Sequence, residues 1–172
     1  AHRAVELGIT DEAALAEEDS SASRETVAEA LRLAQNFMTA TAFESYRTGD
    51  VLSEAPFAFE YAGMRIHGTA DRVGPDHVLD LKTDSEIDEE HHRFQLWAYA
   101  RAFAKPRALL AYLRQNEVRE FDAARLDEIE REAEAMLARI RAGDHAADPE
   151  PIKCSRCRYL QICPEGRSVA AT

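Results

Sequence analysis

The spacing of apolar residues changes midway along the chain, and this change constrains the fold more than any other feature. After Pro56, the residues Phe57, Phe59 and Tyr61 alternate with small or polar residues. Alternation at period two predicts a strand, because successive side chains of a strand point to opposite faces of a sheet. A second strand is expected over Met64–Val73, so the middle of the chain is predicted to form a sheet.

Turn residues separate the predicted strands. Residues 62–63 are Ala-Gly and residues 74–76 are Gly-Pro-Asp, and both combinations favour tight turns. A third short strand is expected over His77–Thr83. Strands joined by such short connections run in opposite directions, so the three are predicted to form an antiparallel meander.

Helical periodicity flanks the predicted meander on both sides. Ser23 is expected to cap a helix that runs to about Tyr46, and a second helix is expected over residues 89–103. A fourth strand is predicted over residues 108–113 and an amphipathic helix over residues 123–142. This order of elements predicts an α/β domain with a mixed central sheet flanked by helices.

The net charge of −11, from 21 basic and 32 acidic residues, would by itself argue against a nucleic-acid-binding protein. The acidic residues are concentrated at 11–19, 84–90 and 127–134, however, and these stretches can face water away from a nucleic acid. No apolar run approaches the roughly 20 residues needed to span a bilayer. No signal peptide opens the chain either, so a cytoplasmic protein without a membrane partner is expected.

Residues 1–6 resemble the middle of a helix that lacks a cap, which is unusual for the start of a mature domain. The chain is therefore expected to be a fragment of a longer protein. Its 172 residues suffice for one globular domain. This domain is predicted to occupy residues 1–149, truncated at its N-terminus, and to be followed by a loop-like, cysteine-containing tail over residues 150–172.

Two charged residues interrupt the third predicted strand. Asp80 and Lys82 are two residues apart and point to one face, whereas Leu79 and Leu81 point to the other. Isolated buried charges are costly. The preceding strand can bring Asp71 close to Asp80, and a divalent cation would relieve the repulsion between the two carboxylates. The alternative is a structural ion pair between Asp80 and Lys82, with Asp71 at a strand end.

Phosphodiester hydrolysis requires the same groups. Metal ions bind the nonbridging oxygen, lower the pKa of an attacking water and stabilise the leaving oxygen. A lysine beside the metal ions can orient or deprotonate that water and offset charge in the transition state. Asp71, Asp80 and Lys82 are therefore the candidate catalytic residues.

The residues Gly68-x-x-Asp71-Arg72 and the later run 78–83 resemble the core of the PD-(D/E)XK nuclease superfamily. They are similar to its RecB-like branch, found in helicase–nucleases such as RecB and AddB with a UvrD/Rep-type motor. Residues 2–6 resemble the first motif of this branch, in which a helical histidine is a metal ligand. The resemblance implies a restriction-endonuclease-like fold, a DNA substrate and Mg²⁺ or Mn²⁺. It further implies metal ligation by His2, Asp71, Asp80 and the backbone carbonyl of Leu81, with Lys82 in catalysis.

Several neighbouring residues have weaker assignments. Gln95-x-x-x-Tyr99 resembles a Gln-x-x-x-Tyr motif of the same branch, and the two side chains share a helix face. They are predicted to bind DNA or to brace the site, with ordinary packing as the alternative. Arg72 is predicted to bind substrate phosphate or to pair with a carboxylate. Glu54 lies where the family often has an acid, but it is expected to be a solvated turn residue, and the histidines at 91–92 are expected on the surface.

The tail Cys154-x2-Cys157-x5-Cys163 resembles the cysteine run that closes AddB-type nucleases. In that pattern a fourth cysteine lies upstream of the first-motif histidine, and the four hold a [4Fe–4S] cluster. The fourth ligand would precede residue 1, so a cluster is expected in the full-length protein and not in this fragment. The alternatives are a zinc ion with His145 as fourth ligand, or three free thiols.

These features predict a divalent-metal-dependent deoxyribonuclease. It is expected to be the exonuclease domain of a helicase–nuclease in recombination or double-strand-break repair. The helicase motor would lie in the same chain or in a partner subunit. Two alternatives remain: a catalytically degenerate nuclease fold that only binds DNA or bridges subunits, and a free-standing exonuclease like those that serve CRISPR adaptation.

Overall fold

The computed structural model describes residues 1–144 and 146–170, which divide into two compact units, Ala1–Glu134 and Ala135–Thr172. His145, the alternative zinc ligand, lies outside the described residues. None of the helices in the described ranges combines the length and apolar content that a membrane span requires. The predicted division at residue 150 stays a prediction.

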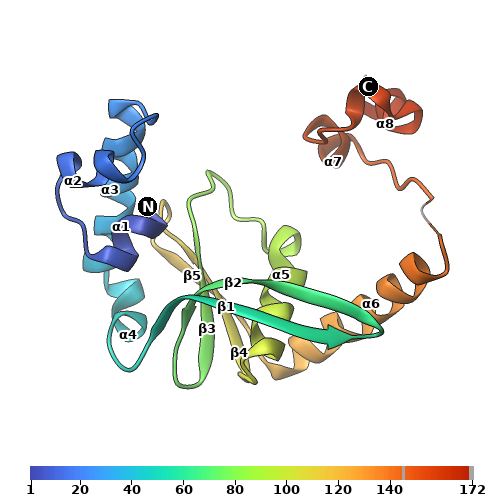
Figure 1. Cartoon of the computed structure of the whole chain (residues 1–172), viewed down its shortest axis with the longest axis horizontal. Coiled ribbons are helices and arrows are strands. Elements are labelled where there is room, and N and C mark those ends of the chain that lie inside the picture. Colours follow the sequence, from blue (N-terminus) through green and yellow to red (C-terminus); the bar gives the residue numbers. More distant parts are fainter. Residues whose placement is uncertain (145, 171–172) are drawn as a thin grey trace. The chain divides into compact units, whose positions relative to one another are not determined.

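A mixed sheet forms the centre of the first unit (Figure 1). The first three strands form the predicted antiparallel meander, the fourth runs parallel to the third, and the fifth returns antiparallel to the fourth. This arrangement confirms the predicted α/β architecture. In order of pairing, the strands are β1 (Leu52–Tyr61), β2 (Met64–Val73), β3 (His77–Lys82), β4 (Arg107–Tyr112) and β5 (Glu117–Phe121).

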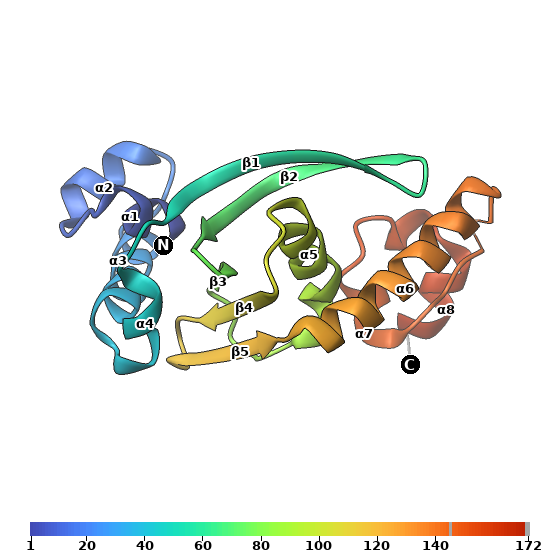
Figure 2. The ribbon, with the colours of Figure 1, turned by 90° about the horizontal axis from the view of Figure 1, so that it is seen from below.

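Helices flank the sheet, and the β1–β2 hairpin extends as a long curved arm (Figure 2). The segment before the sheet forms α1 (His2–Leu7), α2 (Glu12–Glu18), α3 (Arg24–Thr39), the 3-10 helix η1 (Thr41–Phe43) and α4 (Glu44–Arg47). Between and after the later strands lie α5 (Glu89–Ala102) and α6 (Ala123–Arg141), the last of which continues into the second unit.

β3 is buried on both faces because an apolar layer packs on each side of it. Leu79 and Leu81 belong to the core shared with α1, α2 and α3, whereas Val78 belongs to the core shared with α5 and α6. The predicted alternation along this strand is confirmed. Asp80 and Lys82 therefore lie on the same side as Val78, facing α5.

The helix that begins after Ser23 is shorter than predicted. The Ser23 side chain caps it as expected, but α3 ends at Thr39 rather than near Tyr46. The chain then becomes extended for one residue and turns into η1, which buries Phe43 completely. The Phe43 ring packs 5.5 Å from the Phe37 ring, so burial of an aromatic residue favours the break in the helix.

Two elements of the first unit were not predicted, namely α2 and β5. The second of these is half-exposed and carries three charged residues among its five, so its alternation is weak. β1 also begins earlier than expected, at Leu52, and includes Pro56. Proline is tolerated there because β1 is an edge strand of the sheet.

The second unit was expected to be loop-like beyond α6, and this prediction was wrong. Its chain forms α7 (Pro151–Ser155), the 3-10 helix η2 (Leu160–Ile162) and α8 (Pro164–Ala170). Both α7 and α8 begin at a proline, a residue that is favourable at the first helical position. Pro151 and Pro164 therefore mark the starts of short helices.

Candidate active site

Asp80 and Lys82 form an ion pair on the buried strand β3. Oδ2 of Asp80 lies 2.6 Å from Nζ of Lys82, and Asp80 is only 2% exposed. The ammonium of Lys82 meets Oδ2 as an ion pair, and no hydrogen bond of standard geometry reaches this oxygen within the described residues. A buried carboxylate oxygen in this state is costly unless another cationic group or a metal ion completes its surroundings.

His2, Asp71 and Leu81 meet on the neighbouring part of the site. Nε2 of His2 contacts the carbonyl oxygen of Leu81 and lies 3.4 Å from Oδ2 of Asp71. The same Asp71 oxygen accepts the N–H of Leu81 at 2.7 Å. Helix α1 thus brings the predicted histidine ligand to the junction of β2 and β3.

Asp71 lies opposite Asp80 because of the register of β2 and β3. These strands pair Arg72 with Leu79 and Val73 with Val78, so continuation of the register aligns Asp71 with Asp80. Residues directly opposite each other in an antiparallel pair share a face of the sheet. The two carboxylates that the sequence predicted to be neighbours are therefore on adjacent strands.

The surroundings of Asp80 disfavour its charge. Burial and, next, the negative charge of Asp71 raise the pKa of the Asp80 carboxyl to about 6, against the opposing effects of Lys82 and His2. A divalent cation would reverse this balance, because it favours ionised carboxylates.

The donor set fits a hard divalent cation. Carboxylate and carbonyl oxygens are the ligands that Mg²⁺ and Mn²⁺ prefer, and the buried Asp80 oxygen lacks a hydrogen bond. The described side chains do not form a complete metal coordination sphere. Among residues 1–144 and 146–170, no three His, Cys, Asp or Glu side chains are grouped closely enough to hold an ion.

Gln95 and Tyr99 lie on α5 and connect to Lys82. Nζ of Lys82 donates to Oε1 of Gln95 at 3.0 Å, and Nε2 of Gln95 donates to the hydroxyl of Tyr99 at 2.7 Å. Burial raises the pKa of Tyr99, and Asp80 raises it further. Gln95 and Tyr99 were predicted either to bind DNA or to brace the site. Their contacts agree with bracing, because they hold Lys82, whereas DNA binding by either residue stays a prediction.

Arg72 points to the other side of β2. Its guanidinium lies 5.3 Å from the centre of the Phe37 ring, and Nη2 approaches the carbonyl oxygen of Tyr46 at 3.5 Å. It forms no ion pair with a carboxylate in the described part of the chain, and its buried Nε has no hydrogen-bond partner there. The structure therefore does not bring Arg72 together with Asp80 and Lys82, and its role in substrate binding stays a prediction.

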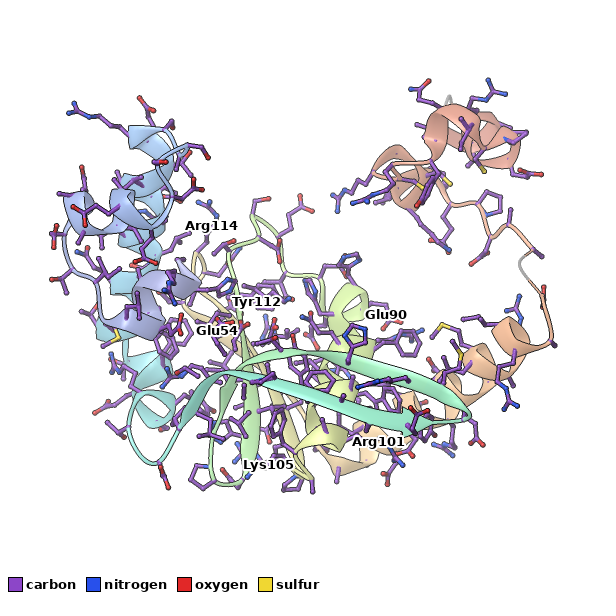
Figure 3. The ribbon with its side chains drawn as sticks, in the orientation of Figure 1. Glu54, Glu90, Arg101, Lys105, Tyr112 and Arg114 are labelled. Carbon is purple, nitrogen blue, oxygen red and sulfur yellow. The ribbon has the colours of Figure 1, made fainter. Side chains whose placement is uncertain are left out.

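Glu54 was expected to be a solvated turn residue, but it lies within β1 and is partly buried. Glu54 falls between the pairs Ser53–Arg72 and Ala55–Ala70 of the β1–β2 register. It lines a cavity of about 10 Å³ together with His2, Glu6 and Asp71. Figure 3 shows the position of Glu54 on the ribbon. Burial raises the pKa of Glu54, and the charge of Asp71 raises it further. Its φ of 47° is unusual for a residue other than glycine, and such strain is concentrated at functional sites. Only its acidic character marked it in the sequence.

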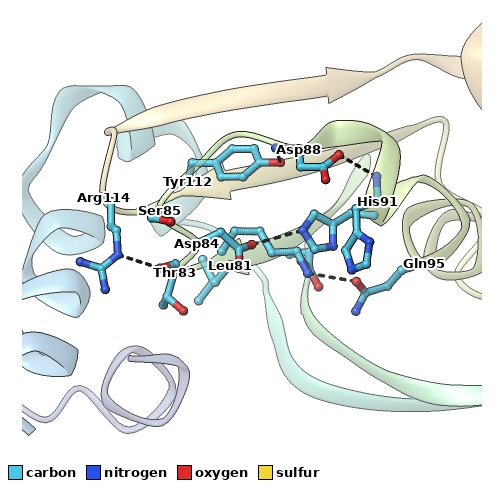
Figure 4. Close-up of polar contacts among 12 residues, drawn as sticks. Leu81, Thr83, Asp84, Ser85, Asp88, His91, Gln95, Tyr112 and Arg114 are labelled. Atoms are coloured by element: carbon cyan, nitrogen blue, oxygen red, sulfur yellow. Dashed lines mark hydrogen bonds and ion pairs between the residues drawn. The ribbon is translucent and has the colours of Figure 1, made fainter. Parts of the chain in front are cut away.

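His92 was expected on the surface, yet its side chain is only 12% exposed. Nε2 of His92 lies 3.2 Å from Oδ2 of Asp84, a residue of the loop after β3 (Figure 4). Burial lowers the pKa of His92, and the charge of Lys82 lowers it further. The charged form of His92 is thus disfavoured at the edge of the site, which the sequence did not reveal because the adjacent His91 has the same chemistry.

The three cysteines lie in the second unit. A methyl group at Gly166 would lie 3.4 Å from Sγ of Cys163 and 3.5 Å from Sγ of Cys154, so this glycine lies between two thiols. The Gly166 N–H also donates to Sγ of Cys163 at 3.3 Å. Cys157 is exposed, and all three cysteines are free.

The sequence matches the PD-(D/E)XK nuclease superfamily over residues 2–164, and the chain therefore belongs to this superfamily. Its mixed sheet flanked by helices is the restriction-endonuclease-like architecture expected for a member. Members are generally metal-dependent nucleases that use Mg²⁺ or Mn²⁺.

The proteins that show similarity to this chain include a phage protein and a protein of known crystal structure. The Gene 69 protein of Mycobacterium phage L5 is 31% identical over 136 residues, which cover 64% of this chain and 43% of the phage protein. The chain thus spans less than half the length of this relative. The crystal structure of SSO0001 superposes with a TM-score of 0.44 at 20% identity, covering 90% of this chain and 81% of that one.

Proposed function

We propose that this chain is a divalent-metal-dependent deoxyribonuclease whose active site contains Asp71, Asp80 and Lys82. The main support is that Lys82 Nζ lies 2.6 Å from Asp80 Oδ2, while Asp71 lies on the adjacent strand of a PD-(D/E)XK nuclease fold. This is the set of acids and amine that phosphodiester hydrolysis requires.

The chain's own residues have distinct tasks in this proposal. Asp71, Asp80, His2 and the Leu81 carbonyl would hold the metal, which supplies charge neutralisation at the phosphate and a more acidic water. Lys82 stays close to the phosphate because Asp80 and Gln95 hold its ammonium from two sides. From there the ammonium orients the attacking water and stabilises negative charge on the phosphate in the transition state.

A cleavage assay on labelled single- and double-stranded DNA tests this function. With Mg²⁺ or Mn²⁺ we expect cleavage that EDTA abolishes. Asp80→Ala and Lys82→Ala should each reduce the rate by at least roughly 100-fold, a typical loss for an essential electrostatic group. Arg24→Ala, which removes an exposed charge in another part of the chain, is the control and should cleave normally. DNA binding without cleavage in the parent chain would instead favour a degenerate nuclease that only binds DNA.

We further propose that the nuclease works beside a helicase motor, as an exonuclease in recombination or break repair. The likeness of its motifs to RecB and AddB supports this, and a free-standing nuclease of the CRISPR-adaptation type is the alternative. Purification of the full-length protein with its natural partners tests the proposal, since co-purification of ATP-dependent unwinding activity is expected. A complete protein with neither a motor sequence nor a motor partner would contradict it.

We also propose that Cys154, Cys157 and Cys163 ligate a [4Fe–4S] cluster in the full-length protein. The proximity of two thiols to Gly166, with its N–H donated to a sulfur, supports a shared ligand site. Iron and acid-labile sulfide should be found in an upstream-extended protein purified without oxygen. Zinc in place of both would favour the alternative with His145, and no metal at all would leave three free thiols.

A further inference from the structure

Phe57 occupies the inner face of the β1–β2 arm, where it packs against α5. Its ring meets the Tyr99 ring edge-on at 5.5 Å and the Phe103 ring at 6.0 Å. Two residues along the same face, Phe59 meets the Trp97 ring at 6.2 Å instead. The two phenylalanines therefore support different residues of the same helix.

Gly68 makes room for the Phe57 ring. The two residues are paired across β1 and β2, and a Cβ atom at Gly68 would lie 3.0 Å from Cζ and 3.2 Å from Cε1 of Phe57. Contacts this short would force the ring to move. A glycine at position 68 thus leaves the Phe57 ring a few tenths of an ångström more room than a larger residue would. The φ of Gly68 is not positive, so backbone strain does not account for the glycine.

The hydrogen bonds beyond Tyr99 have a fixed direction. Because the Gln95 amide nitrogen donates to the Tyr99 hydroxyl, the amide oxygen must face the opposite way, towards Lys82. If Tyr99 moved, Gln95 would lose the partner that fixes its amide orientation. The ammonium of Lys82 would then keep only its contact with Asp80.

We propose that Phe57 is a positioning residue for Lys82, acting through the Tyr99 ring and the Gln95 amide. The inference rests on the proposed nuclease function, in which Lys82 acts at the phosphate. Phe57 holds the Tyr99 ring from the β1–β2 arm, Tyr99 fixes the Gln95 amide, and Gln95 fixes the Lys82 ammonium. An aromatic contact in the arm therefore sets the position of the amine at the site.

Phe57→Ala should lower kcat by roughly 10- to 100-fold, because a displacement of about 1 Å at a reacting group has this effect. The KM for DNA should change by less than about 3-fold, since Phe57 does not contact the substrate in this scheme. Phe57→Leu keeps an apolar side chain against Tyr99 and should recover most of the lost kcat.

Phe59→Ala is the matched control. It removes the same ring from the same face of the same strand, but this ring contacts Trp97 and the Phe57 ring rather than Tyr99. We expect it to lower thermal stability about as much as Phe57→Ala while keeping kcat within about 3-fold of the parent. Equal losses of kcat in the two variants would overturn the proposal, because a general loss of packing would then explain both.

A double-mutant cycle gives a second test. Tyr99→Phe keeps the ring and removes the hydroxyl, so it breaks the chain of contacts one step closer to Lys82. If Phe57 acts through Tyr99, adding Phe57→Ala to Tyr99→Phe should lower kcat little further. Multiplicative effects of the two changes would contradict the proposal.

A readout without cleavage separates this inference from the proposed function. In ¹⁵N-labelled protein, the side-chain amide signals of Gln95 should shift in Phe57→Ala and stay unchanged in Phe59→Ala. Unchanged Gln95 signals in Phe57→Ala would contradict the positioning role. A parent chain that cleaves no DNA with any divalent ion would contradict only the proposed function.

Discussion

Asp80 is the residue at which stability and function conflict most directly. It is almost completely buried, faces the charge of Asp71, and has one cationic neighbour, Lys82. Its pKa of about 6 in the folded protein lies above the ordinary value of 3.8, so folding favours the protonated form. The stability associated with this proton is present at low pH and is lost as the pH rises through about 6.

Asp80→Asn should therefore stabilise the metal-free protein while abolishing cleavage. At pH 8 in EDTA we expect the free energy of unfolding to rise by about 1–3 kcal/mol, because asparagine mimics the neutral acid without desolvating a charge. Urea unfolding measures this change. Near pH 4 the difference should largely disappear, since Asp80 is then protonated in the folded parent.

Asp76→Asn provides the comparison for this prediction. Asp76 is exposed, and its hydrogen bond with His77 lowers its pKa, so removal of its charge should not stabilise the protein. If Asp80→Asn unfolds at a lower urea concentration than the parent at pH 8 in EDTA, the buried charge is better compensated than these contacts indicate.

The residues of the site differ in how far the sequence alone could predict them. Asp80 and Lys82 follow from period-two alternation, and Asp71 follows from the short turn between its strand and theirs. Glu54 and His92 do not, because their positions depend on a strained φ in β1 and on burial against the segment after β3. Tertiary contacts of this kind leave no periodic signal in the sequence.

At the scale of elements, long segments with strong periodicity were predicted well and short ones were not. β2 has the predicted bounds, and α3 has the predicted capping residue. Strand β5 and helices α7 and α8 were not predicted. Each has seven residues or fewer, which is too short to show the hydrophobic periodicity of a strand or a helix. Packing and turn chemistry, rather than local pattern, determine such short elements.

The turn at the tip of the β1–β2 arm offers a stabilising change. Ala62 and Gly63 both have positive φ, 48° and 72°, between the paired residues Tyr61 and Met64. This is the type I′ geometry, in which asparagine is preferred at the first position and alanine is strained. Ala62→Asn should raise the free energy of unfolding by about 0.5–1 kcal/mol.

Ala58→Asn is the control for the turn. Ala58 is exposed on β1 and has no positive φ, so asparagine there should be neutral or slightly destabilising. Thermal unfolding of the two variants in the same buffer makes the comparison. No gain in Ala62→Asn, or the same gain in both, would show that backbone strain in the turn does not limit stability.

At the scale of the whole molecule, two sets of carboxyl groups respond to pH in opposite directions. In the first set, Asp80 is buried and Glu54 is partly buried near other acids, and burial raises the pKa of each. In the second set, Glu29 is partly exposed, Asp76 is exposed, and both are paired. A hydrogen bond from Arg32 lowers the pKa of Glu29 to about 2, and Arg114, which also donates to the Thr83 carbonyl, contributes to the same shift.

The stability of the metal-free protein should consequently pass through a maximum between about pH 4 and 5. As the pH falls from about 6 towards 4, protonation of Asp80 and Glu54 in the folded state increases stability, because their folded-state pKa values are raised. Below about pH 4.5, the contribution of Glu29 is lost as the pH falls towards 2, because its pKa is lowered and its arginine partners lose their counter-charge. Thermal unfolding in EDTA between pH 3 and 8 measures both limbs.

Each limb has its own variant. Asp80→Asn should flatten the limb above pH 5, and Glu29→Gln should reduce the slope of the limb below pH 4.5.

Adding Mg²⁺ at pH 8 should raise the melting temperature of the parent but not of Asp80→Asn, because an ion that binds only the folded site stabilises it by mass action. An equal Mg²⁺ effect in both proteins would place the ion away from Asp80. A monotonic rise in stability up to pH 8 in EDTA would mean that the buried acids are already compensated without it.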